Sequence, residues 1–329
     1  MTNTMTKNEI DRIPIIDLAG CPSVPAPDVV ATFGRACETI GFLVVSNHSV
    51  SAESLDRVMD VSREFFRQPV EVKERYISPT GSLFRGFKHG GQYRGGPVDL
   101  KEGFQASLFD NAQAMIDAGY AAEYAAGFEP NIWPSDEFRT AWRDYMDQIK
   151  QLGQYILKIA ALALGLEEGW FAPKFTRESS YLLANYYPPQ VAAPVGGSVR
   201  LHAHTDYGGF TILYQDTAVG GLEVESRSGS WLRVPAVPGT FIVNLGDMLA
   251  NWTNGRWVAT QHRVRNTEEG EAVSDRISLP FFQHPNLDAV IEIVPTCLNE
   301  GEVPSYEPVE WRDWASRRMS ELRARPARG

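Results

Sequence analysis

The chain has little cysteine and no long apolar run. Its three cysteines, Cys21, Cys37 and Cys297, are odd in number and lack CxxC spacing, which argues against a disulfide framework or a zinc site. No apolar stretch is long enough to span a bilayer, and the N-terminus carries no apolar segment typical of a secretory signal. We therefore expect reduced thiols and a cytoplasmic location.

Basic residues are also scarce relative to acidic ones. The 329 residues include 31 Lys and Arg against 41 Asp and Glu, a formal charge of −10. Nucleic acids and anionic membranes require a basic surface, so neither is an expected partner. P-loop, dinucleotide and serine-nucleophile motifs are absent between strand-like and helix-like segments. We expect a monomer that acts on a small molecule.

The period of the apolar residues divides the chain into regions. The pattern over residues of about 10–120 predicts a mixed α/β region. The longest helix should follow Ser135, a good N-cap. From about 180 to 285 the period becomes two, as in an all-β double sheet or barrel, and about 305–325 regains a helical pattern. No linker is visible, so we expect one domain over 1–329. Shorter expected elements are strands at 13–18 and 42–45, helices at 28–40 and 52–66, a Gly-rich loop at 86–96, and a hairpin at Asn254-Gly255.

Three side chains suggest a metal site. His204 and Asp206 are two residues apart in a strand-like segment, so both project from one face, and His262 lies in a later strand-like run. Two imidazoles and one carboxylate on one side of an ion leave the other side open for substrate and O2, as in non-haem Fe(II) oxygenases. His202 shares the expected face, so His202, His204 and His262 could instead form a three-histidine site. We rank His202 below Asp206, because a single extra histidine beside a metal is more often a supporting residue.

A second set of residues suggests a carboxylate site. Arg276 and Ser278 lie on one face of an apolar strand, and a buried guanidinium is costly unless it meets an anion. No acid in this strand is placed to pair with Arg276, so a bound carboxylate is expected; a distant structural acid is the alternative. Asn185 and Tyr187 share a face of another strand, although such a pattern alone is more typical of an aromatic core.

These residues, with the motifs around them, make the chain resemble the Fe(II)/2-oxoglutarate-dependent dioxygenases of the isopenicillin N synthase-like group over nearly its whole length. The Gly41-to-His48 segment and the Asp99-to-Phe104 segment are similar to N-terminal signatures of this group. Six further motifs follow in the family's order: Asn185-Tyr186-Tyr187-Pro188-Pro189, His204-Thr205-Asp206-Tyr207-Gly208, Gly220-Gly221-Leu222, Asn244-Leu245-Gly246-Asp247, His262-Arg263-Val264 and Arg276-Ile277-Ser278.

The resemblance implies a mainly β fold with flanking helices, namely a double-stranded β-helix (jelly-roll) core wrapped by helices. It also implies that Fe(II) is bound by His204, Asp206 and His262. The activity would be the oxidation, most commonly hydroxylation, of an unactivated C–H bond in a small-molecule metabolite. The cosubstrates 2-oxoglutarate and O2 would give succinate and CO2.

The resemblance further assigns the cosubstrate site. Arg276, Ser278 and Tyr187 would bind the distal carboxylate of 2-oxoglutarate, and Asn185 would lie near its metal end. Two alternatives stay open: a related iron oxidase that uses no 2-oxoglutarate, and an inactive ligand-binding barrel. The intact triad and Arg276 argue against the second.

Substrate specificity should come from segments at the mouth of the barrel. Arginines there could anchor an acidic substrate, although a solvated surface position is the more common one for arginine. The candidate segments are 84–93, 101–104, Arg200, Phe282, Gln283 and the C-terminal helix as a lid, and the candidate arginines are Arg85, Arg94 and Arg200.

Overall fold

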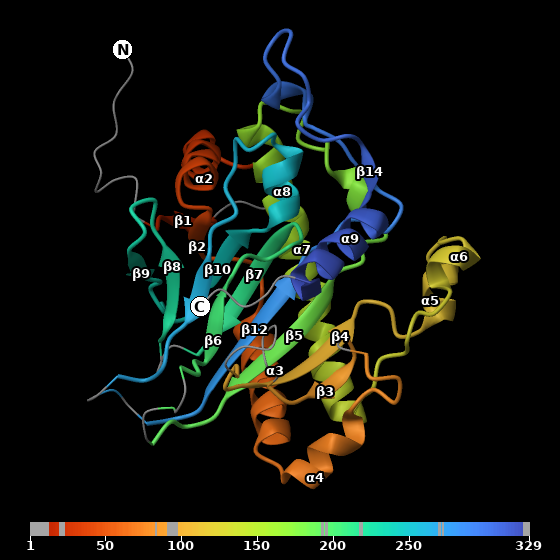
Figure 1. Ribbon diagram of the computed structural model, residues 1–329, viewed down its shortest axis with the longest axis vertical. Helices are drawn as coiled ribbons and strands as arrows, with labels where there is room; N and C mark the ends of the chain where they lie inside the picture. Colours follow the sequence, from red (N-terminus) through yellow and green to blue (C-terminus); the bar gives the residue numbers. More distant parts are fainter. Residues whose placement is uncertain are drawn as a thin grey trace.

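A large antiparallel-rich sheet forms the centre of the molecule (Figure 1). The computed structural model describes residues 13–19, 24–82, 84–90, 98–191, 194, 197–216, 220–268, 271 and 273–324. Short apolar runs with period-two character build its strands. In spatial order they are β1 (Ile15–Asp17), β2 (Phe42–Ser46), β10 (Phe241–Leu245), β7 (Phe210–Gln215), β12 (Arg276–Phe282), β5 (Tyr181–Tyr187), β4 (Glu102–Ser107) and β3 (Gly86–Lys88).

A smaller sheet faces one side of the large one. Its order is β6 (Leu201–His204), β11 (His262–Val264), β8 (Leu222–Glu225) and β9 (Trp231–Arg233), and a separate pair joins β13 (Val290–Ile291) to β14 (Val309–Glu310). Apolar side chains from both sheets pack in the space between them, among them Phe42, Leu213, Ile242, Val224 and Val264. This is the predicted jelly-roll arrangement.

Helices cover the opposite face of the large sheet. These are α2 (Pro27–Thr39), α3 (Ala52–Phe66) and α7 (Asp136–Ala163), whose apolar stripes join the main core. The Ser135 hydroxyl accepts from the Phe138 N–H at 3.1 Å, so α7 begins at the predicted cap. The remaining helices are α4 (Val70–Lys73), α5 (Ala112–Asp117), α6 (Ala122–Ala125), α8 (Asp247–Trp252) and α9 (Trp311–Ala324), with 3-10 turns at Glu74–Tyr76, Ala172–Phe175 and Pro295–Cys297.

Two local predictions were wrong. Gly86–Lys88, expected as loop, is strand β3, because pairing with β4 supplies hydrogen bonds that the local sequence does not reveal. Asn254 and Gly255 do not form a hairpin but end α8, with φ of 53° and 79° and a Gly255 N–H bond to the Ala250 carbonyl at 2.8 Å. Asn-Gly favours left-handed backbone, which helix ends require as much as hairpins do.

The N-terminal region and the barrel share one sheet. β1 runs parallel to β2, which pairs with the barrel strand β10. This agrees with the expected single domain, which stays a prediction. Cys37 is buried and Cys297 half-buried, both as free thiols, whereas Cys21 lies outside the described residues. None of the described helices is both long and apolar enough to cross a bilayer.

A buried carboxyl group at the start of β5 makes stability depend on pH. Glu178 is 1% exposed and accepts from Ser180 Oγ at 2.5 Å and Gln154 Nε2 at 3.0 Å. Burial raises its pKa to about 7, from an ordinary value of 4.5, and these hydrogen bonds together with the charge of Lys150, 3.9 Å away, only partly oppose the shift. The folded state therefore binds this proton more tightly, and its contribution to stability is lost as the pH rises from 4.5 to 7.

We predict that Glu178→Gln removes this dependence. The free energy of unfolding in urea should be measured for both proteins across this range. The difference between the variant and the wild type should shift in favour of the variant by about 1–3 kcal/mol as the pH rises from about 4.5 to 8. Glu167→Gln, at an exposed position, is the control and should track the wild type. A constant difference between the Glu178→Gln protein and the wild type at all pH values would contradict the prediction.

Candidate metal centre and cosubstrate pocket

Strand pairing brings the two predicted histidine ligands together. β6 and β11 are antiparallel neighbours in the small sheet, and His204 lies directly opposite His262. Asp206 follows β6 and turns its carboxylate toward both rings. Its Oδ1 lies 3.7 Å from His204 Nε2 and 3.8 Å from His262 Nε2. One ligand atom from each residue falls within 4.8 Å of the others, so the three can hold a single ion.

Backbone carbonyls fix the tautomer of both imidazoles. His204 Nδ1 lies 2.8 Å from the His202 carbonyl, and His262 Nδ1 lies 3.2 Å from the Thr260 carbonyl. A carbonyl can only accept, so each Nδ1 carries the proton and donates it. Each Nε2 then presents its lone pair to the centre, which is the form a metal requires.

The carboxylate of Asp206 is held by two neighbouring strands. Its Oδ2 accepts from Thr211 Oγ1 at 2.5 Å and from Asn244 Nδ2 at 2.7 Å, which leaves Oδ1 for an ion. Burial opposes ionisation of this group, but the two imidazoles and these hydrogen bonds outweigh burial and lower its pKa. Burial, together with the charge of His262, lowers the pKa of His204 to about 4. At neutral pH the centre therefore offers a carboxylate beside a neutral His204 imidazole.

His202 does not join this group. Its Nδ1 lies 2.6 Å from Asp99 Oδ1, and its backbone N–H donates to the same oxygen at 3.0 Å. The geometry therefore favours Asp206 over His202 as the third member of the group, because Asp99 holds the His202 ring. The bond instead ties the start of β6 to the segment before β4.

Arg276 is buried with unused donors. It is 1% exposed, and its Nη2 donates to Gln215 Oε1 at 2.5 Å, while Nε and Nη1 have no partner. Throughout the described ranges, no carboxylate lies within ion-pair distance of this guanidinium; the adjacent Asp216 pairs with Arg63. A cation buried beside a neutral amide, with donors to spare, is suited to a carboxylate ligand.

The other predicted cosubstrate residues surround Arg276. Tyr187 and Asn185 of β5 lie opposite Arg276 and Ser278 of β12, and all four line one cavity with the metal triad. The Arg276 Cζ atom lies 4.9 Å from the centre of the Tyr187 ring. Lys101 Nζ donates to Asn185 Oδ1 at 2.9 Å and reaches the same cavity. The sequence-predicted residues are thus brought together in one site.

Several specificity predictions need correction. Arg200 and Arg85 are not solvated surface residues: they are 1% and 9% exposed. The pKa of Arg200 is lowered by burial and then by the charge of Arg276, and its Nε and Nη2 have no partner. Gln283, directly after β12, is fully buried and packs against Gly153 of α7, because its side chain continues the alternation of the strand and lies on the face opposite to Phe282. Arg94 lies outside the described residues.

Sequence reasoning assigned no role to three supporting residues. Thr211 and Asn244 hold Asp206, and Gln215 holds Arg276. Thr211 and Gln215 share the inward face of β7, which the alternation of that strand could have indicated. Their partners depend on the order of strands in the sheet, for which the local sequence carries no signal.

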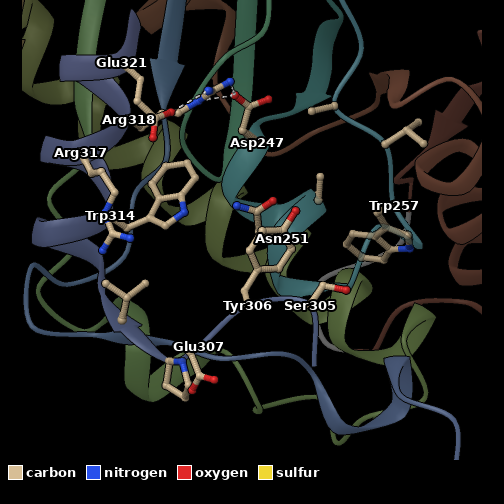
Figure 2. A pocket seen from close by; sticks show the side chains of 15 residues that line it. Asp247, Asn251, Trp257, Ser305, Tyr306, Glu307, Trp314, Arg317, Arg318 and Glu321 are labelled. Carbon is tan, nitrogen blue, oxygen red and sulfur yellow. Dashed lines mark hydrogen bonds and ion pairs between the residues drawn. The ribbon is translucent and has the colours of Figure 1, made fainter. Parts of the chain in front are cut away.

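The C-terminal helix α9 contacts Asp247, which is hydrogen-bonded to Thr205 and Asp206. Arg318 of α9 donates two hydrogen bonds to Asp247 Oδ2, at 2.9 and 2.5 Å, on one wall of a cleft of about 850 Å³ between α8 and α9 (Figure 2). Asp247 also accepts from the Thr205 hydroxyl at 3.3 Å, and its N–H donates to the Asp206 carbonyl at 2.7 Å. The helix expected as a lid is therefore linked to the backbone that carries Asp206.

Comparison with known proteins matches both halves of the chain. Residues 178–285 match the model of the 2OG-Fe(II) oxygenase superfamily, and residues 13–136 match that of the non-haem dioxygenase in morphine synthesis N-terminal region. The 2-oxoglutarate-Fe(II) type oxidoreductase ppzC of Metarhizium rileyi is 31% identical, over 94% of this chain and 87% of its own length.

Solved structures agree in fold and in overall extent. A full-length Neurospora crassa protein in complex with alpha-KG and thymine superposes with a TM-score of 0.81 at 25% identity, over 94% of this chain and 96% of that one. JOX2 in complex with 2OG, Fe and JA gives a TM-score of 0.76 at 28% identity, over 96% and 86%. The chain belongs to the 2OG-Fe(II) oxygenase superfamily. Within it, the chain is a 2-oxoglutarate-Fe(II) type oxidoreductase.

We predict that Asn244→Ala weakens metal binding without unfolding the protein. The substitution removes the 2.7 Å hydrogen bond that orients Asp206 Oδ2. Loss of such a supporting contact typically costs about 10–100-fold in metal affinity. Anaerobic Fe(II) titration measures the effect, and Asn299→Ala, at an exposed position, is the control. Unchanged Fe(II) affinity in Asn244→Ala would show that Asp206 needs no such support.

Proposed function

We propose that the chain oxidises a C–H bond of a small molecule, with 2-oxoglutarate as cosubstrate. The proposed outcome is hydroxylation. His204, Asp206 and His262 would hold Fe(II). Arg276, Ser278 and Tyr187 would hold the distal carboxylate of 2-oxoglutarate, with Asn185 near its metal end. Bound together, Fe(II), 2-oxoglutarate and O2 supply the oxidising power and yield succinate and CO2.

One observation carries the proposal. Three ligand atoms within 4.8 Å of one another share a buried cavity with a guanidinium that has two unused nitrogen donors. A metal site alone would not call for the buried Arg276. A carboxylate site alone would not call for two imidazoles with their Nε2 lone pairs turned inward. A dicarboxylate keto acid bound to Fe(II) accounts for both features.

The protein's part is placement and desolvation. Backbone carbonyls hold the two imidazoles, while Thr211 and Asn244 hold the carboxylate of Asp206. These contacts fix the donor set before any ligand arrives, which lowers the cost of ordering the site. Apolar side chains such as Leu183, Leu213 and Val264 line the rest of the cavity and limit water around it.

We predict that Arg276→Ala separates cosubstrate binding from metal binding. The variant should bind 2-oxoglutarate at least about 100-fold more weakly, while its Fe(II) affinity stays within about threefold of the wild type. The anaerobic Fe(II)–2-oxoglutarate charge-transfer band in visible light reports the cosubstrate. Arg317→Ala, at an exposed position, is the matched control.

His262→Ala should abolish the band by removing a metal ligand. Equal loss of Fe(II) and 2-oxoglutarate affinity in Arg276→Ala would contradict the assigned carboxylate pocket. Iron binding without a band in the wild type would instead favour an oxidase that uses no 2-oxoglutarate. Absence of iron binding would favour an inactive barrel.

A further inference from the structure

A second cavity adjoins the metal centre. Its volume is about 300 Å³, and it lies between the outer ends of β4 and β5, residues 84–85 and α9. Tyr207, next to Asp206 in sequence, and Tyr181 of β5 form its inner wall, with their hydroxyls 3.0 Å apart. The Tyr181 ring also lies 4.8 Å from that of Phe282, which lines the metal cavity. The two cavities therefore meet at these rings.

The walls of the outer cavity are largely aromatic. The rings of Tyr207 and Trp311 are nearly parallel, at 11° and a centroid distance of 6.3 Å. His284 packs against Trp311 at 4.7 Å, and Phe84 meets Tyr181 edge-on at 6.3 Å. Flat, rigid walls of this kind favour a flat apolar ligand body, which they can contact by stacking.

Gln105 presents an unused donor among these walls. It is 2% exposed and lines the cavity, and its Oε1 accepts from Lys88 Nζ at 3.2 Å. Because Lys88 Nζ donates to this oxygen, the oxygen end of the amide faces Lys88 and the NH2 end points away from it. The Nε2 group is then the free end and has no partner. A buried NH2 group in this position calls for an acceptor on a ligand.

Arg85 adds a positive charge to the same cavity. It is 9% exposed, and its Nε and Nη1 donate to the backbone carbonyls of Glu129 and Phe84 at 2.9 and 2.6 Å. These neutral acceptors do not cancel its charge. The Glu129 carboxylate, which also lines the cavity, accepts from the hydroxyls of Ser78 and Thr80. Its charge acts on Arg85 and raises the pKa of that group against the larger effect of burial, but no ion pair between the two is found in the described ranges. Burial lowers the pKa of Arg85 to about 10, so it stays charged at neutral pH.

These polar groups distinguish between classes of ligand. A cation would be repelled by the Arg85 guanidinium, which lines the cavity. A neutral carbonyl would satisfy Gln105 Nε2 but would add no negative charge beside the Arg85 guanidinium. A carboxylate supplies both the acceptor and the negative charge.

We propose that this cavity binds the substrate, and that the substrate is a small carboxylic acid with a flat, apolar body. The carboxylate would accept from Gln105 Nε2 beside the Arg85 guanidinium. The body would lie against Tyr207 and Trp311, with its reacting carbon toward the metal centre. This assignment rests on the proposed function.

The test uses equilibrium binding in a protein whose cosubstrate site is disabled. Phenylacetate, 3-phenylpropionate and 2-naphthoate, and the primary amide of each, are titrated calorimetrically into metal-free Arg276→Ala protein. This background prevents the acids from binding at Arg276. We expect the acids to bind at least about tenfold more tightly than their amides.

Adding Gln105→Glu, a nearly isosteric substitution, to the Arg276→Ala protein should weaken acid binding at least about tenfold. Adding Gln151→Glu, the same change on the exposed surface of α7, should have no effect.

Each other outcome contradicts the assignment. Equal affinity for acids and amides would overturn it, as would acid binding that survives Gln105→Glu. Absence of binding by every acid would overturn it too. If Gln105→Glu does not fold, Arg85→Gln carries the same expectation of a tenfold loss, by about 1.4 kcal/mol. Because no iron is present, these results are independent of the charge-transfer band that tests the proposed function.

Discussion

The site depends above all on the pairing of β6 with β11. That pairing sets His204 opposite His262 and lets Asp206, just past the end of β6, complete the group. A shift of one residue in this register would turn one imidazole to the other face of the sheet and destroy the site. The register is secured from both sides, since β11 also pairs with β8 and Asp99 holds His202 of β6.

The large sheet supplies the residues that position the Asp206 carboxylate and the buried guanidinium. Its inward face supplies Thr211 and Asn244 to orient Asp206, and it supplies Arg276 with its neighbour Gln215. Its other face packs on α2, α3 and α7, which keeps these strands in one arrangement. The metal centre therefore stands between a small sheet that provides the imidazoles and a large sheet that positions the carboxylate and the guanidinium.

Much of this could be predicted from the sequence. The His204-x-Asp206 spacing at the end of a strand and the lone Arg276 in an apolar strand carry local signals of period two, and the capped α7 carries one of period 3.6. Asn244 and Gln215 could not be assigned roles, because only the order of strands places them beside Asp206 and Arg276. Arg85 and Arg200 were misjudged for a related reason: the burial of a single arginine is decided by distant segments. Asn254-Gly255 was misread because helix ends and hairpins require the same left-handed backbone.

The most direct test of the account is a crystal structure grown without oxygen in the presence of Fe(II) and 2-oxoglutarate. We predict one ion bound by the Nε2 atoms of His204 and His262 and by Oδ1 of Asp206. The distal carboxylate of 2-oxoglutarate should accept hydrogen bonds from Arg276. An ion bound by His202 in place of Asp206, or a distal carboxylate held away from Arg276, would contradict it.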